Sequence, residues 1–259
     1  MKRKIIQFIS LISLNSYYKG FINKVNYGGT LKKICIPVIN CWSCPSALMG
    51  CPIGAIEVYV KSGQIPYIPF LYIIVPGLLL GRFFCGFICP AGFLQELVFQ
   101  IKTRKFKLYN YLVYLPVFSM VFGVVIFSYL SSRAWFSRYL CPMGTIQASF
   151  PWLMLDEGIR NNIGGVFLYK VFFLILLILL CIFVFRFFCR TLCPLGFILG
   201  IFNKVAFLKI KYFEENCDRC ESCKNVCPVE LRIPEEVNNF KCIRCMNCVN
   251  ICKKGCLKV

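Results

Sequence analysis

Nineteen cysteines and no histidine direct the chemistry of this 259-residue chain toward thiolates. The missing imidazole excludes bis-His haem, Rieske centres, the common zinc enzymes and Ser-His catalysis, because each requires a histidine at the reacting centre. Disulfides, metal ions and iron–sulfur clusters remain as uses for the cysteines. Their spacing distinguishes between these uses.

The C-terminal cysteines form two copies of one spacing, C-x2-C-x2-C-x3-C. The eight positions are Cys217, Cys220, Cys223, Cys227, Cys242, Cys245, Cys248 and Cys252. In bacterial two-cluster ferredoxins, the fourth cysteine of each such run binds the cluster of the other run. We therefore expect two [4Fe-4S] clusters here, one on Cys217, Cys220, Cys223 and Cys252, the other on Cys242, Cys245, Cys248 and Cys227. Zinc knuckles and disulfides are the alternatives, but zinc pairs usually come as two C-x2-C units around a longer loop.

A second spacing, C-x3-C-P, occurs twice in the apolar part of the chain. Residues 82–93 (RFFCGFICPAGF) and 186–197 (RFFCRTLCPLGF) agree at eight of twelve positions with an offset of 104. Parallel repeats would bring these cysteines together across a pseudo-two-fold axis. We expect a membrane-embedded [4Fe-4S] cluster on Cys85, Cys89, Cys189 and Cys193, with Arg82 and Arg186 offsetting its negative charge. Alternatively, the cysteines are small packing residues and the arginines obey the positive-inside rule.

Five further cysteines lie outside these motifs in CIPVINCWSCPSALMGCPIG and RYLCPMG. They are Cys35, Cys41, Cys44, Cys51 and Cys141. One interpretation is a second embedded cluster on Cys41, Cys44, Cys51 and Cys141, with Cys35 as the substitute. The other is disulfide pairing, because the outer compartment can be oxidising. Cys181 is expected to serve packing, Cys256 stays unassigned, and no catalytic residue is predicted.

The composition predicts that most of the chain lies in a membrane. It is 58% hydrophobic and 16% charged, against roughly 25% charged residues in soluble proteins. The 30 Lys and Arg residues exceed the 11 Asp and Glu residues, but the positive charge flanks apolar segments, which favours membrane orientation over nucleic-acid binding. Lipid is therefore an expected partner and nucleic acid is not.

Four apolar segments are candidate spans. Residues 65–81, 111–130 and 166–185 approach the length of about 20 residues that a bilayer helix requires. The apolar run after Lys2-Arg3-Lys4 reads as a retained anchor. Four spans place the Met1–Lys4 tip, the Lys102–Lys107 loop and the tail from Lys204 in the cytoplasm. They leave the Lys19–Lys61 loop outside, although it contains five lysines.

The expected fold is therefore mainly α. A four-helix transmembrane part, residues 1–203, is built from two parallel repeats, about 1–107 and 108–203. A small α+β domain of the bacterial two-cluster ferredoxin kind follows at 204–259. That domain is too short to bury a large core, so its clusters should supply much of its folding free energy.

Together these motifs resemble the membrane-bound polyferredoxins of the NapH, NosR and CcoG type. The resemblance rests on the doubled C-x3-C-P and the eight C-terminal cysteines, and it covers nearly the whole chain. It implies a multi-pass protein of a bacterial or archaeal cytoplasmic membrane with the C-terminal domain in the cytoplasm. Such proteins relay electrons between cytoplasmic or quinone-pool donors and a partner oxidoreductase, a reductase or a flavoprotein. The chain lacks the covalent-flavin domain of the NosR type and carries the extra outer cysteines.

Electron relay is the function we expect, as a component of an oxidoreductase system rather than a self-contained enzyme. A hydrocarbon layer about 30 Å thick needs a stepping-stone inside it for efficient transfer. Two alternatives stay open: a quinol-oxidising subunit of a respiratory reductase, and a membrane-anchored iron–sulfur redox sensor. Glu96 is the one acid near a C-x3-C-P motif and is a candidate for a quinone site. An acid on an interfacial helix is usually solvated, however.

Overall fold

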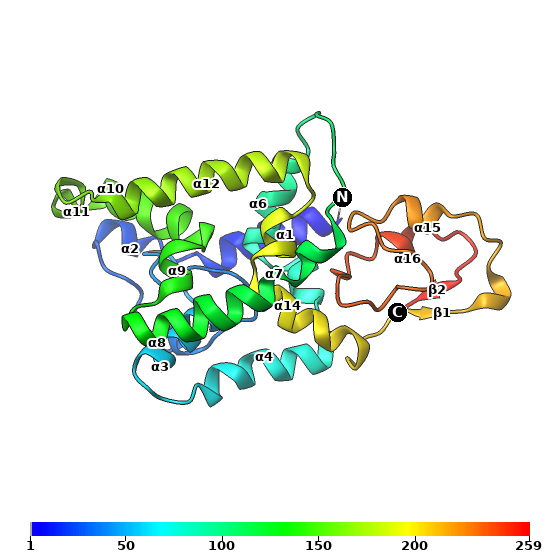
Figure 1. The fold of residues 1–259 in the computed structure, drawn as a ribbon, viewed down its shortest axis with the longest axis horizontal. Helices are drawn as coiled ribbons and strands as arrows, with labels where there is room; N and C mark the ends of the chain where they lie inside the picture. Colours follow the sequence, from blue (N-terminus) through cyan, green and yellow to red (C-terminus); the bar gives the residue numbers. More distant parts are fainter. Residues whose placement is uncertain (1) are drawn as a thin grey trace.

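The computed structural model describes residues 2–259, so Met1 of the expected cytoplasmic tip lies outside the described residues. The described chain is mainly helical with a single two-stranded sheet. In Figure 1 the longer helices run roughly along the long axis of the molecule, and the C-terminal domain lies at one end of that axis.

The helices of the first half follow one another in a fixed order. They are α1 (Lys2–Leu14), α2 (Lys19–Ile22), η1 (Thr30–Lys33), α3 (Pro52–Lys61), α4 (Tyr67–Leu80), α5 (Phe83–Phe87) and α6 (Pro90–Phe99). A second set follows: η2 (Asn110–Tyr114), α7 (Leu115–Phe118), the π-helical η3 (Ser119–Ile126), α8 (Phe127–Ser131), α9 (Trp135–Tyr139), the π-helical η4 (Gly144–Ser149), α10 (Phe150–Leu155), α11 (Glu157–Asn161), α12 (Gly165–Phe183), α13 (Phe187–Thr191), α14 (Pro194–Ile201) and η5 (Phe202–Lys204).

The second half repeats the order of the first around its cysteine motifs. In the first half, α3 begins directly after Cys51 and is followed by the longer apolar helix α4, the short helix α5 and then α6. The second half has η4 with α10, then α12, α13 and α14. Helices α3, α6 and α14 each begin with proline directly after a cysteine N-cap, where the missing N–H of proline costs nothing.

Within residues 2–259, two helices are long and apolar enough to cross a membrane: the continuous helix Tyr111–Ser131 and α12. Only 17% of the apolar window of α12 is buried, whereas the core helix of a soluble protein would be mostly buried. Helix α4 has 14 residues and contains Pro76, and α1 has 13, so both are shorter than the length a bilayer requires. The four-span arrangement therefore stays a prediction.

The C-terminal domain is closed by a short antiparallel sheet. Strand β1 (Lys211–Tyr212) pairs with β2 (Leu257–Lys258), with Tyr212 opposite Leu257. Between them lie η6 (Glu214–Asn216), α15 (Ser222–Asn225) and α16 (Asn247–Ile251). Its apolar core contains Ile210, Val229, Leu231, Ile233, Val237, Ile243 and Leu257, together with the buried Cys242 and Cys248. The ferredoxin-like description of this domain remains a prediction.

Candidate iron–sulfur centres

The four cysteines of the two C-x3-C-P motifs, which we call the inner cysteines, come together between the two repeats. Cys85 lies on α5 and Cys89 is the N-cap of α6, and Cys189 and Cys193 occupy the equivalent positions on α13 and at the N-cap of α14. All four are buried in one cluster of side chains. Every pair among them lies close enough for their charges to interact. Two motifs separated by about a hundred residues therefore form one thiol site, as the repeat predicts.

The two arginines before these motifs each reach across to the other repeat. Arg82 donates to the carbonyl oxygen of Cys189 at 2.8 Å, and Arg186 donates to the carbonyl oxygen of Cys85 at 2.5 Å. Both side chains are buried, with 3% and 0% exposure. A lipid-facing interfacial arginine would remain solvated, so the arginines belong to the thiol site.

Gly92 and Gly196, each two residues after the proline of a C-x3-C-P motif, leave room for these arginines. A Cβ atom on Gly92 would lie 2.9 Å from the guanidinium carbon of Arg186, and one on Gly196 would lie 2.9 Å from a guanidinium nitrogen of Arg82. Separations under about 3.0 Å are essentially never found for real Cβ atoms. Each repeat therefore carries a glycine because the arginine of the other repeat packs against its backbone.

The polar groups around the four thiols fit a negatively charged sulfur-ligated cluster. The Nε atoms of Arg82 and Arg186 are buried and have no hydrogen-bond partner within residues 2–259. Arg82 lies beside the Cys85 thiol, and Arg186 lies within charge range of Cys85, Cys89 and Cys189. A buried donor without an acceptor costs about 1–3 kcal/mol. A cluster sulfur would supply that acceptor, so the donor set fits the group.

Sulfur atoms in the second repeat receive hydrogen bonds from N–H groups. The side-chain amide of Gln95 donates to the Cys189 Sγ at 3.0 Å, and the backbone N–H of Gly196 donates to the Cys193 Sγ at 3.3 Å. Position 199, which corresponds to Gln95 in the second repeat, is leucine. The two repeats are therefore unequal around the thiols. The motif pattern gave no signal for Gln95.

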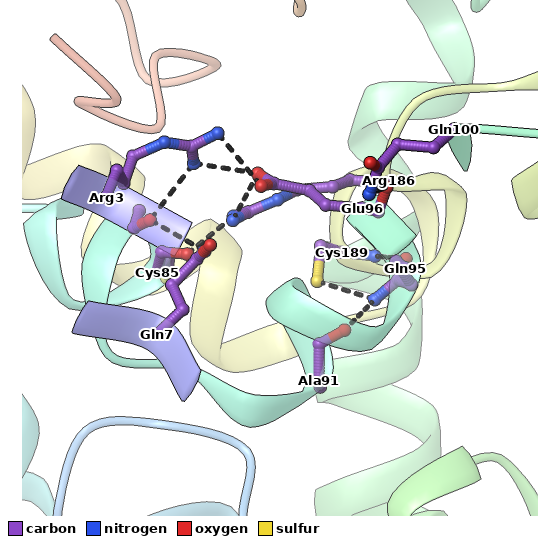
Figure 2. Close-up of polar contacts among 10 residues, drawn as sticks. Arg3, Gln7, Cys85, Ala91, Gln95, Glu96, Gln100, Arg186 and Cys189 are labelled. Atoms are coloured by element: carbon purple, nitrogen blue, oxygen red, sulfur yellow. Dashed lines mark hydrogen bonds and ion pairs between the residues drawn. The ribbon is translucent and has the colours of Figure 1, made fainter. Parts of the chain in front are cut away.

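Glu96 is buried at 4% exposure, and the expectation that an interfacial acid is solvated was wrong. Figure 2 shows its carboxylate between two guanidinium groups, Arg3 of α1 and Arg186. Arg3 binds both carboxylate oxygens at 2.8 and 2.9 Å, and Arg186 lies at 2.7 Å. Gln7, one turn further along α1, donates to the carbonyl oxygen of Gly86 at 2.9 Å. Helix α1 therefore contributes to the site, a role that its reading as an anchor did not predict.

Four of the C-terminal cysteines lie close to one another. Every pair among these four thiols lies within charge range, and the members are Cys227, Cys242, Cys245 and Cys248. Burial raises the pKa of Cys242 to about 11 and that of Cys248 to about 12. Metal ligation must therefore displace protons from these thiols. The group contains the fourth cysteine of the first run, as the crossed ligand pattern predicts.

The remaining C-terminal cysteines line a second cavity of about 560 Å³, shared by Cys217, Cys220, Cys223, Cys252 and Cys256. Cys220 is the exposed member. Cys256, which the spacing left unassigned, donates to the carbonyl oxygen of Asn216 at 2.9 Å and lies beside Cys217 and Cys252. Exposed acids, Glu214 and Glu221 among them, stand at the rim.

The outer cysteines, which lie in the loop between η1 and α3 and just after α9, are close to one another. Cys41, Cys51 and Cys141 line one cavity of about 320 Å³. Cys35 lies within charge range of Cys51, and Cys44 within charge range of Cys41. The loop carrying them is tied to η4, because the backbone N–H of Cys41 donates to the Gln147 Oε1 at 2.7 Å. Both a cluster and disulfides stay open here.

Cys181 lies on α12, where its thiol donates to the Gln95 Oε1 at 3.6 Å, and the amide nitrogen of the same Gln95 side chain donates to the Cys189 Sγ. It is buried, as its expected packing role requires. Within residues 2–259, no three Cys, Asp or Glu side chains stand close enough to hold a single metal ion. That finding does not test a cubane cluster, in which each of four irons takes one thiolate.

Comparison with known proteins identifies iron–sulfur domains in both parts of the chain. A model described as "4Fe-4S binding domain" matches residues 62–109, 113–155 and 167–212, and one described as "4Fe-4S dicluster domain" matches 209–253. The uncharacterized protein MJ0750 of Methanocaldococcus jannaschii is 32% identical over 80% of this chain and 84% of its own length.

Two further relatives are more distant. The putative electron transport protein YccM of Escherichia coli is 26% identical over 70% of this chain and 53% of its own length. The regulatory protein NosR of Stutzerimonas stutzeri is 28% identical over 64% of this chain, which spans only 22% of NosR. No solved structure matches the chain. The chain thus belongs to the polyferredoxin-type family of 4Fe-4S binding proteins, which serve iron–sulfur electron transfer.

Proposed function

We propose that this chain relays electrons through a membrane, from C-terminal clusters on the cytoplasmic side, through a cluster between the two repeats, toward the outer thiols. The observation that supports this most is the meeting of Cys85, Cys89, Cys189 and Cys193. Four thiols from two repeats match the ligand number of one [4Fe-4S] cluster. Such a cluster accepts and returns one electron at a time.

The residues around this group have defined tasks in the proposal. Arg82 and Arg186 offset the negative charge of the thiolates and join the two repeats through the Cys189 and Cys85 carbonyls. Gln95 and the backbone of Gly196 donate to sulfur atoms, which stabilises the more reduced charge state. Glu96 and Arg3 fix Arg186 in place. The buried setting keeps water from the thiols.

The partner in this proposal is a redox protein, a reductase or a flavoprotein, that docks at the exposed end of the C-terminal domain. Cys220 is exposed there, and transfer between proteins requires that a ligand set approach the surface. The bacterial or archaeal membrane location, the four spans and the cytoplasmic C-terminal domain belong to the same proposal. The two helices long enough to span a bilayer support it.

A specific cavity favours a second candidate function, the oxidation of quinol. A cavity of about 330 Å³ lies between α6, η4 and α12, and its lining is almost wholly apolar. Gln95 is its amide, and the same side chain contacts the Cys189 Sγ. An isoprenoid quinone needs an apolar slot and few polar groups. This cavity meets that requirement beside the inner thiols.

Metal analysis of anaerobically purified protein tests the relay. About eight irons per chain would mean that only the C-terminal domain is loaded, and about twelve or sixteen would support one or two further clusters. Cys85→Ser with Cys189→Ser should lower the iron content by about four and remove one paramagnetic signal after dithionite reduction. A variant that keeps the full content and signal would contradict the proposal. Reoxidation of reduced protein by a menaquinone analogue alone would favour the quinol function.

A further inference from the structure

The C-terminal domain touches the inner motif backbone to backbone. Gly86 lies between Cys85 and Cys89, and a Cβ on it would stand 2.5 Å from the carbonyl oxygen of Ile243 and 3.2 Å from that of Arg244. Ile243 and Arg244 lie between Cys242 and Cys245. The part of α5 that follows Cys85 therefore packs on the segment between two C-terminal cysteines. Any side chain at position 86 would separate them.

The equivalent position in the second repeat differs. Position 190 is arginine where the first repeat has Gly86. Arg190 is directed to Glu230 of the C-terminal domain at 3.7 Å and lies within charge range of Cys227. The first repeat thus presents the bare backbone of Gly86 to the C-terminal domain, and the second repeat presents the buried guanidinium of Arg190 to it.

Buried polar contacts hold the C-terminal domain against the first C-x3-C-P motif. Arg244, 1% exposed, donates to the carbonyl oxygens of Leu80, Leu208 and Asn203. Asn203 donates in turn to the carbonyl oxygens of Asn239 and Cys242, at 3.1 and 2.7 Å. Arg82, already bonded to Cys189, donates to the carbonyl oxygen of Phe240 at 3.1 Å. One guanidinium therefore bridges the inner thiol site and the C-terminal domain.

Of the two C-terminal thiol sets, the one that contains Cys245 lies nearer to the charged residues of the inner site. The Cys245 thiol lies within charge range of Arg3 and Arg186, which both bind Glu96. The set that contains Cys217 and Cys220 opens to solvent instead, and Cys220 is exposed. The two C-terminal sets are therefore not equivalent with respect to the membrane part.

We propose that Gly86 and the Cys242–Cys245 turn form the junction for electron transfer between the two parts of the chain. The thiol set of Cys227, Cys242, Cys245 and Cys248 then faces the inner site, and the set of Cys217, Cys220, Cys223 and Cys252 faces the partner. With clusters bound to both sets, one electron would pass across the junction from the reduced cluster to the oxidised one, with no proton transfer and no bond made or broken. The inference rests on the proposed function and assigns the order of its sites.

The test compares paramagnetic resonance spectra of dithionite-reduced protein. Two reduced clusters that are close together broaden each other's signals. Cys245→Ser should remove the interaction with the inner cluster, and Cys220→Ser should lose one signal but keep that interaction. Gly86→Ala and Gly86→Val should weaken the interaction in a graded way at unchanged iron content. Gly28→Val is the matched control, because nothing lies within 4 Å of a Cβ at Gly28.

Opposite results would overturn the assignment. An interaction that survives Cys245→Ser and disappears in Cys220→Ser would place the other set at the junction. An interaction that is unchanged in Gly86→Val would show that the turn contact does not set the spacing. If Gly86→Val loses iron, the two serine variants still decide. Wild-type protein with only about eight irons would end the proposed function, whereas an inner signal without any interaction would end only this inference.

Discussion

Arg186, from the second repeat, donates a hydrogen bond of 2.5 Å to the carbonyl oxygen of Cys85 in the first. Arg82 makes the reciprocal bond to Cys189 at 2.8 Å. The two arginines thus join the halves at the thiol site through backbone carbonyl groups. The symmetry does not include Glu96, which pairs with Arg186, because the corresponding residue of the second repeat is Gly200.

Glu96→Gln should destabilise the inner site. Arg186 is fully buried and would lose its carboxylate partner at 2.7 Å, and breaking a buried pair costs about 3–5 kcal/mol. We expect a loss on the order of 3 kcal/mol in the free energy of unfolding, measured by denaturant titration of detergent-purified protein. Glu230→Gln is the control, since its pair with Arg190 is 3.7 Å long and Glu230 is 30% exposed. Equal losses in both variants would refute the role of Glu96.

Gly196→Ala should destabilise the protein more than Gly54→Ala, although both glycines belong to C-P-x-G motifs. A Cβ at Gly196 would meet Arg82 at 2.9 Å and the Cys189 carbonyl oxygen at 3.2 Å, whereas at Gly54 the nearest atom is 3.8 Å away. Overpacking typically costs about 1–3 kcal/mol. Thermal unfolding should show a clear loss for Gly196→Ala and little change for Gly54→Ala. The reverse order would mean that the cross-repeat packing is not what requires glycine.

The sequence predicted the meeting of the inner cysteines because a repeat carries spatial information. Two copies of one motif in parallel halves must lie at equivalent positions, so their thiols share an axis. The same repeat indicated Arg82 and Arg186, although not that each bonds to the carbonyl of the other half. The crossed C-terminal pattern likewise grouped Cys227 with Cys242, Cys245 and Cys248, as the structure does.

Contacts from outside the repeat could not be predicted in this way. Arg3 and Gln7 lie about eighty or more residues from their partners Glu96 and Gly86, and a short basic N-terminus reads equally well as an anchor. Gln95 has no counterpart in the second repeat. The pairing of the outer cysteines is also not decided by spacing, because the repeat relates Cys51 to Cys141 and leaves three further thiols in the same region without counterparts.

Gln95→Leu should lower the reduction potential of the inner cluster. The Gln95 amide donates to the Cys189 Sγ at 3.0 Å, and hydrogen bonds to ligand sulfurs raise cluster potentials. A potentiometric titration followed by paramagnetic resonance measures the change. Gln100→Leu is the matched control, because the Gln100 amide donates to the Glu96 carbonyl oxygen at 3.2 Å and to no sulfur atom within residues 2–259. A potential that is equal in the two variants would exclude a tuning role for Gln95.

Cys252→Ser and Cys256→Ser should differ in iron content. Both thiols lie in the exposed C-terminal cavity, and they contact one another. The spacing assigns Cys252 as the fourth ligand, so its loss should remove about four irons and one signal. Cys256→Ser should keep the full content. If Cys256→Ser loses the cluster and Cys252→Ser retains it, the ligand assignment must be exchanged.

Glu57→Gln should remove one component of the dependence of stability on pH. Glu57 is fully buried on α3 and accepts hydrogen bonds from the backbone N–H of Phe136 at 2.6 Å and from both N–H and hydroxyl of Ser137. Burial raises its pKa from 4.5 to about 7, and these hydrogen bonds only partly oppose that shift. The native state therefore holds a proton that the unfolded state releases above about pH 4.5.

The sign follows from this difference in bound protons. Stability from this group is highest at or below its unfolded pKa, and it falls as pH rises to about 7, by at most about 1.4 kcal/mol per pH unit. Above about pH 7 both states are ionised, and the contribution becomes constant. The midpoint of thermal unfolding, measured at a series of pH values between about 5.5 and 7.5, should fall with pH less steeply in Glu57→Gln than in wild type. The exposed acid Glu157 provides the control, because Glu157→Gln should retain the wild-type slope. An unchanged slope in Glu57→Gln would show that Glu57 is ionised throughout this range.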